Sequence, residues 1–533
     1  MHDLEYDKVA VWRRRRDRAK EIRDTEQQTW DKNLLSYQGK LKPKDNIWAE
    51  DDPWVSVELV HSTIRSAIPN LLYSNPKFTL TPKRPEIDLD TGADISWDRA
   101  RSAELWLQHI WAECEANTHT RSAIISAFLD LGIAKFGFAP TYADDDKRGV
   151  IQYDESGSIV IESQTDEGYI IPRLERGEFL LDEDGEYIFD EDTGIAVTHP
   201  GCIMREDFFI EWVSARNVLF DPEGGNVLKN HRWIIEEWNR PLSEIRNDPR
   251  IAPSIRSEIK SNARIDEYGQ LKTGLGEVES IERTGRPEDA DDLRVTGFDV
   301  YDFVERRYYS IADCDGNEDM NNFFLVDRQI PPGLEHGPLR LLKFNEEPGQ
   351  VYQKTDAEGM AKLELEYNIT RSQLATHRNQ SRARYLEVAN QGFAGEDGGE
   401  VERSKFQSGA SGVICRVKNP DGIVPARKDQ VGNDFCAAIP NIKDDFREVA
   451  GQPGGADTVA DADTATQASL LTAQADIRNN DRRDNLVSKF ITELARGLLQ
   501  VAAANVTQVQ FVKVRKSEND PLPFEFKQIN PED

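Results

Sequence analysis

The chain has 533 residues, with 96 acidic against 66 basic side chains and a formal net charge of -30 at pH 7. Tight binding of nucleic acid needs a local excess of lysine and arginine, so this balance argues against a protein that grips DNA, although an acidic surface can let DNA pass. Five scattered cysteines predict free thiols, and no apolar run reaches membrane-spanning length. The length exceeds what one hydrophobic core supports, so two or more packed units are expected.

The first predicted element is a charged helix over residues 6–37. Its inner face is predicted to carry four large side chains, Ile22, Trp30, Leu34 and Tyr37. Arg13 to Arg16 are consecutive and therefore point around the helix, so we expect them to pair with carboxylates of this acidic protein. A basic tail that binds nucleic acid is the alternative.

Three more helices are predicted, at about 57–68, 96–117 and 120–131. Gly132 and the run from Lys135 to Thr141 indicate a turn into a strand. All ten tryptophans lie at or before Trp238, which predicts one large aromatic-rich lobe ending near residue 240.

Residues 142–201 contain three carboxylate clusters, several of which run into a glycine, alternating with short Val- and Ile-rich segments. The clusters are Asp144 to Asp146, Asp182 to Asp184 and Asp190 to Asp192. Asp and Gly supply tight turns, so the pattern predicts β-hairpins. Calcium binding is the alternative, but the full spacing of alternate oxygen ligands closed by a glutamate is missing from the sequence.

Residues 241–262 are predicted to form a short amphipathic helix, interrupted at Pro249 and Pro253. A small β-rich unit over 263–354 is expected to follow, with a hairpin around Asp313 to Asp319.

The next predicted element is a long helix over 355–390, in the middle of the chain. Thr355 and Glu358 have capping-box spacing. An apolar stripe of Met360, Leu363, Tyr367 and Leu374 then fades into polar residues, while Arg371, Arg378 and Arg382 form a basic line at helical spacing. The second half cannot bury itself alone, so we expect copies of the chain to cover it. The alternative is an ordinary surface helix with solvated arginines.

Residues 391–450 are predicted to end in a helix that packs Ile442, Phe446 and Val449. A glycine-rich acidic loop at 451–463 precedes a second long helix within 464–533. That helix opens on a capping box at Thr464 and Gln467, and its apolar face is predicted to be Val487, Phe490, Leu494, Leu498 and Val501. The tail from Val506 to Val514 alternates like a strand.

Catalytic signatures are missing from the sequence, which has no phosphate-binding GxxxxGK[ST] loop, HExxH, CxxC or GxSxG motif. The eight histidines show no metal-ligand spacing. We therefore predict that the protein is not an enzyme and holds no cofactor or metal. A metal-dependent nuclease built from scattered carboxylates is the alternative.

Six segments, which together span most of the chain, resemble the portal proteins of tailed bacteriophages in order and spacing. They are IPNLLYSNPKFTLTPKRPE (68–86), ISAFLDLGIAKFGF (125–138), WVSARNVLFDPEG (212–224), LRLLKFNEEPGQVYQKTDA (339–357), LEYNITRSQLATHR (365–378) and DTATQASLL (463–471).

The resemblance implies a mainly helical α+β portal fold, assembled as a ring, usually a dodecamer. Its parts would be a wing (1–240, with the acidic insertion at about 142–201, and 391–450), two stem helices (241–262 and 355–390), a β-rich clip (263–354), a tunnel loop (451–463), and a long helix with a short crown (464–533).

Three sets of site residues follow from this resemblance. The DNA-facing tunnel loop would carry Gly451, Gln452, Pro453, Gly454, Gly455, Asp457, Asp461 and Asp463. The stem would present Arg371, Arg378 and Arg382 to the neighbouring subunit. The clip would contact the packaging motor and neck proteins through Asp313, Asp315, Asn317 and Glu318.

The implied partners are other copies of the chain, the terminase large subunit, a neck (head-completion) adaptor, and capsid and scaffolding proteins, with double-stranded DNA passing through the channel. The implied location is the portal vertex of a virion, after synthesis in the host cytoplasm and with no membrane attachment. A structural adaptor elsewhere in a virion, which need not close a ring, is a further alternative.

Overall fold

The computed structural model describes residues 2–43, 54–72, 75–85, 87, 94–142, 149–152, 159–165, 169–181, 186–189, 194–199, 201, 203–248, 251, 256, 259–265, 271–273, 293–313, 324–380, 385–387, 394, 400–407, 416–419, 421, 423–425, 433–451, 477–507, 509–515 and 524–529. It combines helices and strands, as the predicted α+β class requires. The chain forms two compact units, as its length predicted. The first contains Met1–Asp31, Ile64–Asp356 and Ile477–Asp533, and the second contains Lys32–Thr63 and Ala357–Asp476.

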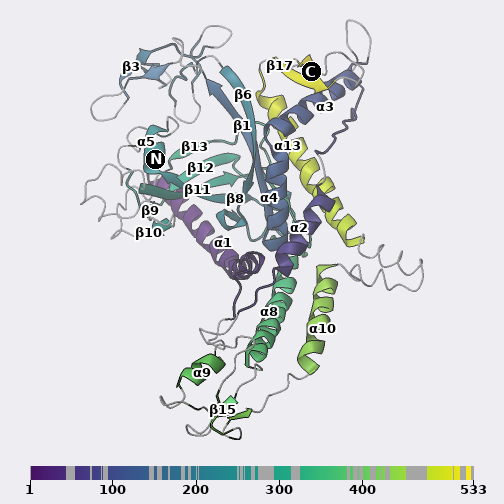
Figure 1. Cartoon of the computed structure of the whole chain (residues 1–533). Coiled ribbons are helices and arrows are strands. Elements are labelled where there is room, and N and C mark those ends of the chain that lie inside the picture. Colours follow the sequence, from purple (N-terminus) through teal and green to yellow (C-terminus); the bar gives the residue numbers. More distant parts are fainter. Residues whose placement is uncertain are drawn as a thin grey trace. The chain divides into compact units, whose positions relative to one another are not determined.

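The first unit contains an antiparallel three-stranded sheet in the order β14-β1-β6, with β1 at Gly132–Tyr142, β6 at Ile203–Val213 and β14 at Leu339–Leu342. The predicted strand after Gly132 is thereby confirmed. Helices α3 (Ser96–Glu113), α4 (Ala116–Leu129) and α13 (Thr492–Asn505) lie along this sheet (Figure 1). Phe136 of β1 faces α13, where it meets Gly497, while its neighbour in sequence, Lys135, faces the other way and pairs with Glu236.

A seven-stranded antiparallel sheet lies on that other side. Its strands are β7 (Val218–Phe220), β8 (Trp233–Pro241), β9 (Ala263–Ile265), β10 (Leu271–Thr273), β11 (Leu293–Asp302), β12 (Arg307–Ala312) and β13 (Val326–Gln329). Strand β8 pairs with β11 from Trp233 opposite Asp302 to Pro241 opposite Arg294. This pairing joins the chain before residue 240 to the chain after 293 in one sheet. The prediction that residues 263–354 form a separate β unit is therefore wrong, because their strands share a sheet with β8.

The helix expected over 241–262 is described in part. Helix α5, Leu242–Asn247, ends before the predicted interruption at Pro249, Arg256 is also helical, and the chain enters β9 at Ala263. Ile245, Ile251 and Ile259 are buried in a cluster with Val295 of β11 and with Leu325. Residues 249–250, 252–255 and 257–258 lie outside the described residues.

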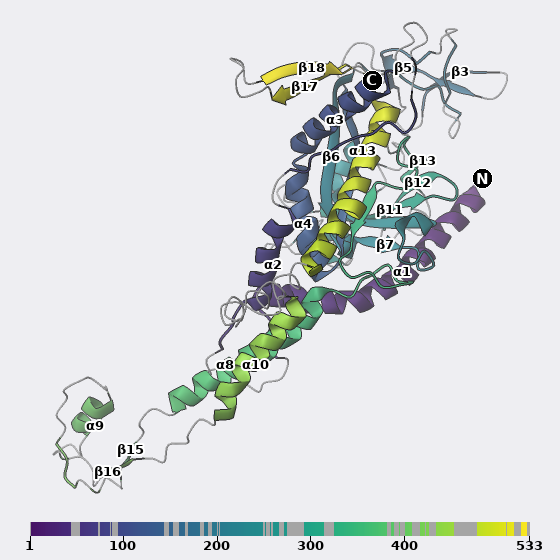
Figure 2. The ribbon, with the colours of Figure 1, turned by 90° about the vertical axis from the view of Figure 1, so that its right-hand side faces the viewer.

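Helix α1, His2–Tyr37, covers the remaining face of the seven-stranded sheet through Val9, Trp12 and Ala19 (Figure 2). Trp233 and Ile235 face this helix, whereas Ile234 between them faces the three-stranded sheet, as strand alternation requires. The predicted burial of Trp30 is confirmed, but Ile22 is exposed. The adjacent Arg23 occupies the buried position instead, because it binds Glu237 on β8.

The acidic insertion contains two short antiparallel pairs, β2 (Val150–Ile151) with β5 (Leu174–Arg176), and β3 (Ile161–Gln164) with β4 (Ile170–Pro172). The hairpin-like character predicted for this segment is confirmed for these strands. The three carboxylate clusters lie outside the described residues.

The second unit is built around α8 (Asp356–Gln380) and α10 (Asn433–Ala450), with α9 (Glu400–Gln407) and the strand pair β15 (Tyr385–Glu387) and β16 (Ile423–Pro425) between them in sequence. The long central helix is confirmed, but it is shorter than predicted. It reaches Gln380, and Tyr385–Glu387 forms a strand because it pairs with Ile423–Pro425.

The last long helix begins at residue 477 in the described chain and contains a π-helical segment, Asn485–Ile491, before α13. Phe490, Leu494, Leu498 and Val501 are buried as predicted, but Val487 is exposed and Leu486 is buried in its place. In a π-helix the backbone hydrogen bonds join residues i and i+5, so each turn contains more residues than in an α-helix. Leu486, four residues before Phe490, therefore lies on the same face as Phe490, and Val487, three residues before it, does not.

The chain ends in a two-stranded sheet, β17 (Gln510–Arg515) with β18 (Phe524–Ile529), so the strand predicted near 506–514 is present with later bounds. Of the helices in the described ranges, none combines the length and apolarity needed to cross a membrane.

Candidate functional site

Helices α8, which carries Arg371 and Arg378, and α10, which Gly451 follows, lie side by side in both views (Figures 1 and 2). They approach closely near the start of α8, since a Cβ built on Gly359 would lie 3.0 Å from Val449 Cγ1. Ile442 and Phe446 of α10 are buried as predicted, whereas Val449 is partly exposed. The pair is therefore packed at one end through a small residue on α8.

The buried stripe of α8 beyond this contact is polar. Glu364, Asn368 and Ser372, spaced four residues apart, face an extended segment that precedes α2 (Leu59–Leu71). The N–H of Val55 donates to Ser372 Oγ (2.8 Å), that of Val57 to Asn368 Oδ1 (2.9 Å) and that of Leu59 to Glu364 Oε1 (3.0 Å). We call this set of three bonds the polar ladder.

The polar ladder works because two periodicities match. Four residues rise about 6 Å along an α-helix, and two residues advance about 6.6 Å along an extended chain. Successive side chains of the polar ladder therefore meet alternate backbone N–H groups of the extended segment. These N–H groups, which have no strand partner among the described residues, thereby gain an acceptor. Sequence reasoning missed these residues, although the Glu, Asn and Ser at intervals of four were visible. The polar ladder runs beside the apolar stripe and ends at Ser372, so it does not cover the polar residues that follow Leu374.

Glu364 also acts at the start of α2. Its second carboxylate oxygen accepts a hydrogen bond from the hydroxyl of Ser36, near the end of α1, and the helix start at Leu59 and Val60 supplies N–H donors. Burial raises the pKa of Glu364 to about 7, although these hydrogen bonds oppose the shift. A carboxyl group that ionises near neutral pH therefore holds three segments of the second unit together.

The predicted basic line on α8 has two described members. Arg371 is half-buried and Arg378 is exposed, and neither pairs with a carboxylate within the part of the chain that the structure describes. Arg382 lies outside the described residues. The two arginines are therefore available cations on the part of the helix that the polar ladder does not cover.

The predicted tunnel loop is described only at Gly451. This glycine ends α10 with φ of +76°, a left-handed conformation that side chains disfavour, and its N–H donates to the carbonyl of Glu448. The other seven predicted loop residues, from Gln452 to Asp463, lie outside the described residues.

The helix that follows this loop in sequence is fixed by a buried ion cluster. Asp356 accepts hydrogen bonds from Arg478 (2.9 Å), Arg482 (2.7 Å) and Asn345 (3.0 Å). The guanidinium of Arg482 also lies 5.1 Å from the ring of Phe128. Desolvation lowers the pKa of Arg482, and the charge of Asp356 opposes that effect. The start of this helix is therefore anchored within the first unit.

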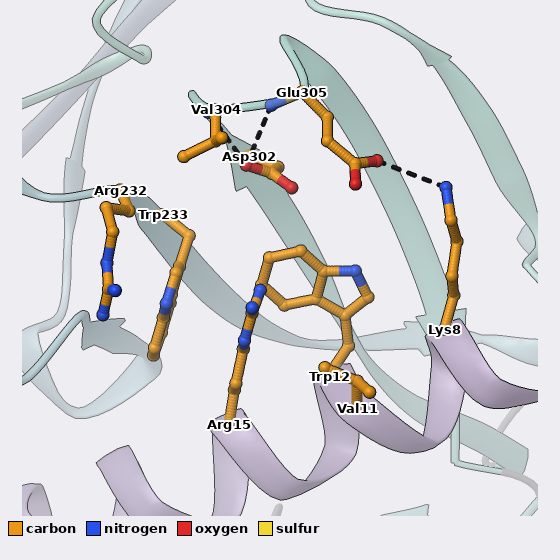
Figure 3. Close-up of a pocket in the computed structure, with 9 residues that line it drawn as sticks. All are labelled: Lys8, Val11, Trp12, Arg15, Arg232, Trp233, Asp302, Val304 and Glu305. Atoms are coloured by element: carbon orange, nitrogen blue, oxygen red, sulfur yellow. Dashed lines mark hydrogen bonds and ion pairs between the residues drawn. The ribbon is translucent and has the colours of Figure 1, made fainter.

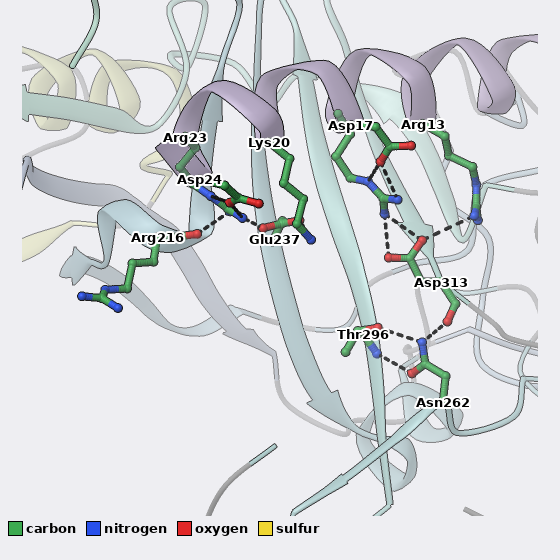
Figure 4. A network of polar contacts seen from close by, with 11 residues as sticks. Arg13, Asp17, Lys20, Arg23, Asp24, Arg216, Glu237, Asn262, Thr296 and Asp313 are labelled. Carbon is green, nitrogen blue, oxygen red and sulfur yellow. Dashed lines mark hydrogen bonds and ion pairs between the residues drawn. The ribbon is translucent and has the colours of Figure 1, made fainter. Parts of the chain in front are cut away.

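Of the predicted clip residues, only Asp313 is described, and it serves the fold of its own chain. It lies at the end of β12, where Arg16 Nη1 of α1 donates to its two carboxylate oxygens at 2.8 and 2.6 Å and Arg13 lies 3.4 Å away (Figure 4). Asn262 accepts from the Thr296 N–H and donates to the carbonyl of Asp313.

This network confirms, for Arg13 and Arg16, the prediction that the consecutive arginines pair with the protein's own carboxylates. Arg14 donates instead to the carbonyl of Ala10, and Arg15 lies over the ring of Trp12. Asp315, Asn317 and Glu318 lie outside the described residues.

A recess of about 460 Å3 lies between α1 and the seven-stranded sheet (Figure 3). Trp12 and Trp233 meet edge to face at 6.1 Å, and the guanidinium of Arg15 lies 4.4 Å from the Trp12 ring.

Both carboxylates of the recess make local contacts. Asp302 accepts from the N–H groups of Val304 and Glu305, and Glu305 binds Lys8 and the Tyr309 hydroxyl. The described lining residues include no serine, cysteine or histidine that could act as a nucleophile or base.

No family model matches the chain, and no curated protein matches it either. Within the described ranges, the structure brings together no group of three or more His, Cys, Asp or Glu side chains that could hold a metal ion.

Proposed function

We propose that the chain is one subunit of a portal ring of a tailed bacteriophage, the channel through which DNA enters and leaves the head. One observation carries the proposal. Helix α8, a segment that contains the strand pair β15–β16, and helix α10 follow one another in the chain, and the portal resemblance implies the same succession of helix, β-rich segment and helix for the stem and clip.

The parts of such a subunit have different bounds from those predicted from sequence. Helices α8 and α10 are the better candidates for the stem, and residues 381–432, which include β15, α9 and β16, for the clip. Residues 241–262 and 263–354 would instead belong to the wing, since their strands join the seven-stranded sheet. Residues 451–463, of which only Gly451 is described, keep their proposed place at the tunnel.

The surface of α8 supports assembly into a ring. The polar ladder covers one stripe of this helix, while Arg371 and Arg378 are left without carboxylate partners among the described residues. Subunits of a closed ring present two different surfaces to each other, so arginines on one surface can meet carboxylates on the next. The net charge of -30 supplies abundant carboxylates for that purpose and would keep DNA from adhering to the channel.

In this proposal the protein is not an enzyme. The terminase partner would hydrolyse ATP, and the ring would provide its docking site at one capsid vertex, together with sites for the neck adaptor and for capsid and scaffolding proteins.

The proposal is tested by the mass of the assembled protein and by its effect on DNA. Purified full-length chain should give a closed oligomer by native mass spectrometry, with a dodecamer as the expected species. Linear duplex DNA incubated with it and magnesium should remain intact. A monomer that persists at high concentration would contradict ring formation. Cleavage that disappears with a chelator would favour the nuclease alternative.

A further inference from the structure

A second recess, of about 350 Å3, lies in the first unit between residues 226–229, the end of β14 and the π-helical segment before α13. Its lining is basic in a strongly acidic protein. The charged side chains that border it are Lys229, Arg340, Lys343, Glu346, Lys489 and Glu493. Four positive groups therefore converge on a space that contains two carboxylates.

Two of the cations are already matched. Lys489 Nζ lies 2.9 Å from Glu346 Oε1, and Lys229 Nζ lies 3.4 Å from Glu493 Oε2. Glu493 also binds Arg496, which lies outside the lining, at 2.6 Å. Both carboxylates are therefore paired with cations other than Arg340 and Lys343.

Arg340 and Lys343 are the unmatched pair. Their residues are 8% and 6% exposed, and neither forms an ion pair within the described chain. Lys343 donates only to the carbonyl of Asn226 (3.0 Å). Arg340 donates from Nε and Nη1 to three backbone carbonyls, which leaves the Nη2 group without a described partner. Donors thus remain on both cations.

The electrostatics agree with this geometry. Burial lowers the pKa of Lys343 to about 8, and Glu346 only partly opposes the effect. Burial also lowers the pKa of Arg340 to about 10 against the weaker influence of Glu493. The guanidinium of Arg340 also lies 4.8 Å from the ring of Phe136, a contact that stabilises a cation. The carboxylates nearest to Arg340 and Lys343 are already paired with other cations, so an added anion would lower the cost of burying these two positive charges.

We propose that this recess is a binding site for a phosphate dianion, with Arg340 and Lys343 as its principal ligands. An excess of two positive charges matches inorganic phosphate or a terminal phosphate monoester, which carries close to two negative charges at neutral pH. Arginine and lysine are the side chains that bind such oxyanions through charge-assisted hydrogen bonds. A phosphodiester of duplex DNA has one charge per phosphate, and the acidic surface of the chain repels it.

The test is isothermal titration of the full-length protein with inorganic phosphate at pH 7, where Lys343 is mostly protonated. Saturable binding at one site per chain is expected, and Lys343→Met should weaken it about tenfold or more, the size of a charge-assisted hydrogen bond. Methionine fills a similar volume, and it removes a buried charge that lacks a carboxylate partner, so the variant should fold. Its thermal midpoint without phosphate checks this.

The matched control is Lys362→Met, an exposed residue of α8 that does not line the recess, which should bind phosphate within about twofold of the wild type. Three further ligands separate the possible sources of the anion. A nucleoside monophosphate should compete with inorganic phosphate, whereas acetate and a short DNA duplex should not. Absence of saturable binding, equal affinity in the Lys343→Met protein, or displacement by duplex DNA would each overturn the proposal.

Discussion

Replacing the carboxylate of Glu364 by an amide should change how the free energy of unfolding depends on pH. Glutamine has nearly the same shape, its carbonyl oxygen can still accept from the Leu59 N–H, and its NH2 group can donate to the Ser36 hydroxyl. The variant Glu364→Gln therefore preserves the polar ladder and removes only the ionisable group. Any difference from the wild type in the pH dependence of the free energy of unfolding is then due to the ionisation of Glu364.

The sign and size of the effect follow from the raised pKa. Burial moves the pKa of Glu364 from 4.5 in the unfolded chain to about 7 in the folded one. The folded state therefore holds the proton more tightly, so the wild type loses stability as pH rises from 4.5 through 7. At 1.36 kcal/mol per pH unit, the full loss is about 3 kcal/mol, complete by roughly pH 8. Glu364→Gln cannot lose it.

The assay is urea denaturation of the wild type, Glu364→Gln and the exposed control Glu366→Gln at pH 5 and pH 8. The free energy of unfolding of the wild type should fall by about 2–3 kcal/mol more between pH 5 and pH 8 than that of Glu364→Gln. The control Glu366→Gln should show the same fall as the wild type. Because two units can unfold separately, hydrogen exchange of a peptide containing Leu59 provides a local reading of the same change. Parallel pH profiles for Glu364→Gln and the wild type would refute the reasoning.

Three further changes test the other contacts. Asn368→Leu leaves the Val57 N–H without its acceptor and should cost about 1–3 kcal/mol in urea denaturation; an unchanged midpoint would mean that the polar ladder adds nothing. Asp313→Asn removes the charge that holds the α1 arginines and should cost about 1–3 kcal/mol, with faster proteolysis within residues 2–37; wild-type cleavage rates would argue against this anchoring. Arg371→Glu combined with Arg378→Glu should abolish oligomers in native mass spectrometry, while Lys362→Glu should assemble normally; intact oligomers in the double variant would remove these arginines from the interface.

Local patterns were sufficient for several helices. The central helix and the buried Ile442 and Phe446 of α10 in the second unit follow from helical spacing, which depends on residues close in sequence. Most of the apolar face ending at Val501, in the first unit, follows in the same way. The same reasoning found the strand after Gly132.

The failures have non-local causes. Residues 241–262 were assigned to a helical stem, but β8 and β11, on either side of them in sequence, pair in one sheet, and Ile245, Ile251 and Ile259 are buried in a cluster with Val295 of that sheet. Val487 was misplaced because a π-helical segment changes the register of the face. The polar ladder could not be anticipated, since it depends on an extended segment about 310 residues earlier in the chain.

The contacts of Asp313 were missed for a related reason. The portal resemblance implied a partner contact for it, whereas within the chain Arg16 of α1 engages its carboxylate. Acidic residues in a sequence do not reveal which of the chain's own arginines will reach them.

The most direct test of the portal proposal is a two-dimensional class average of the purified full-length protein, viewed along the symmetry axis by electron microscopy. The proposal predicts closed rings with a central hole wide enough for a DNA duplex. Single subunits at high concentration, open filaments, or rings with a closed centre would contradict it.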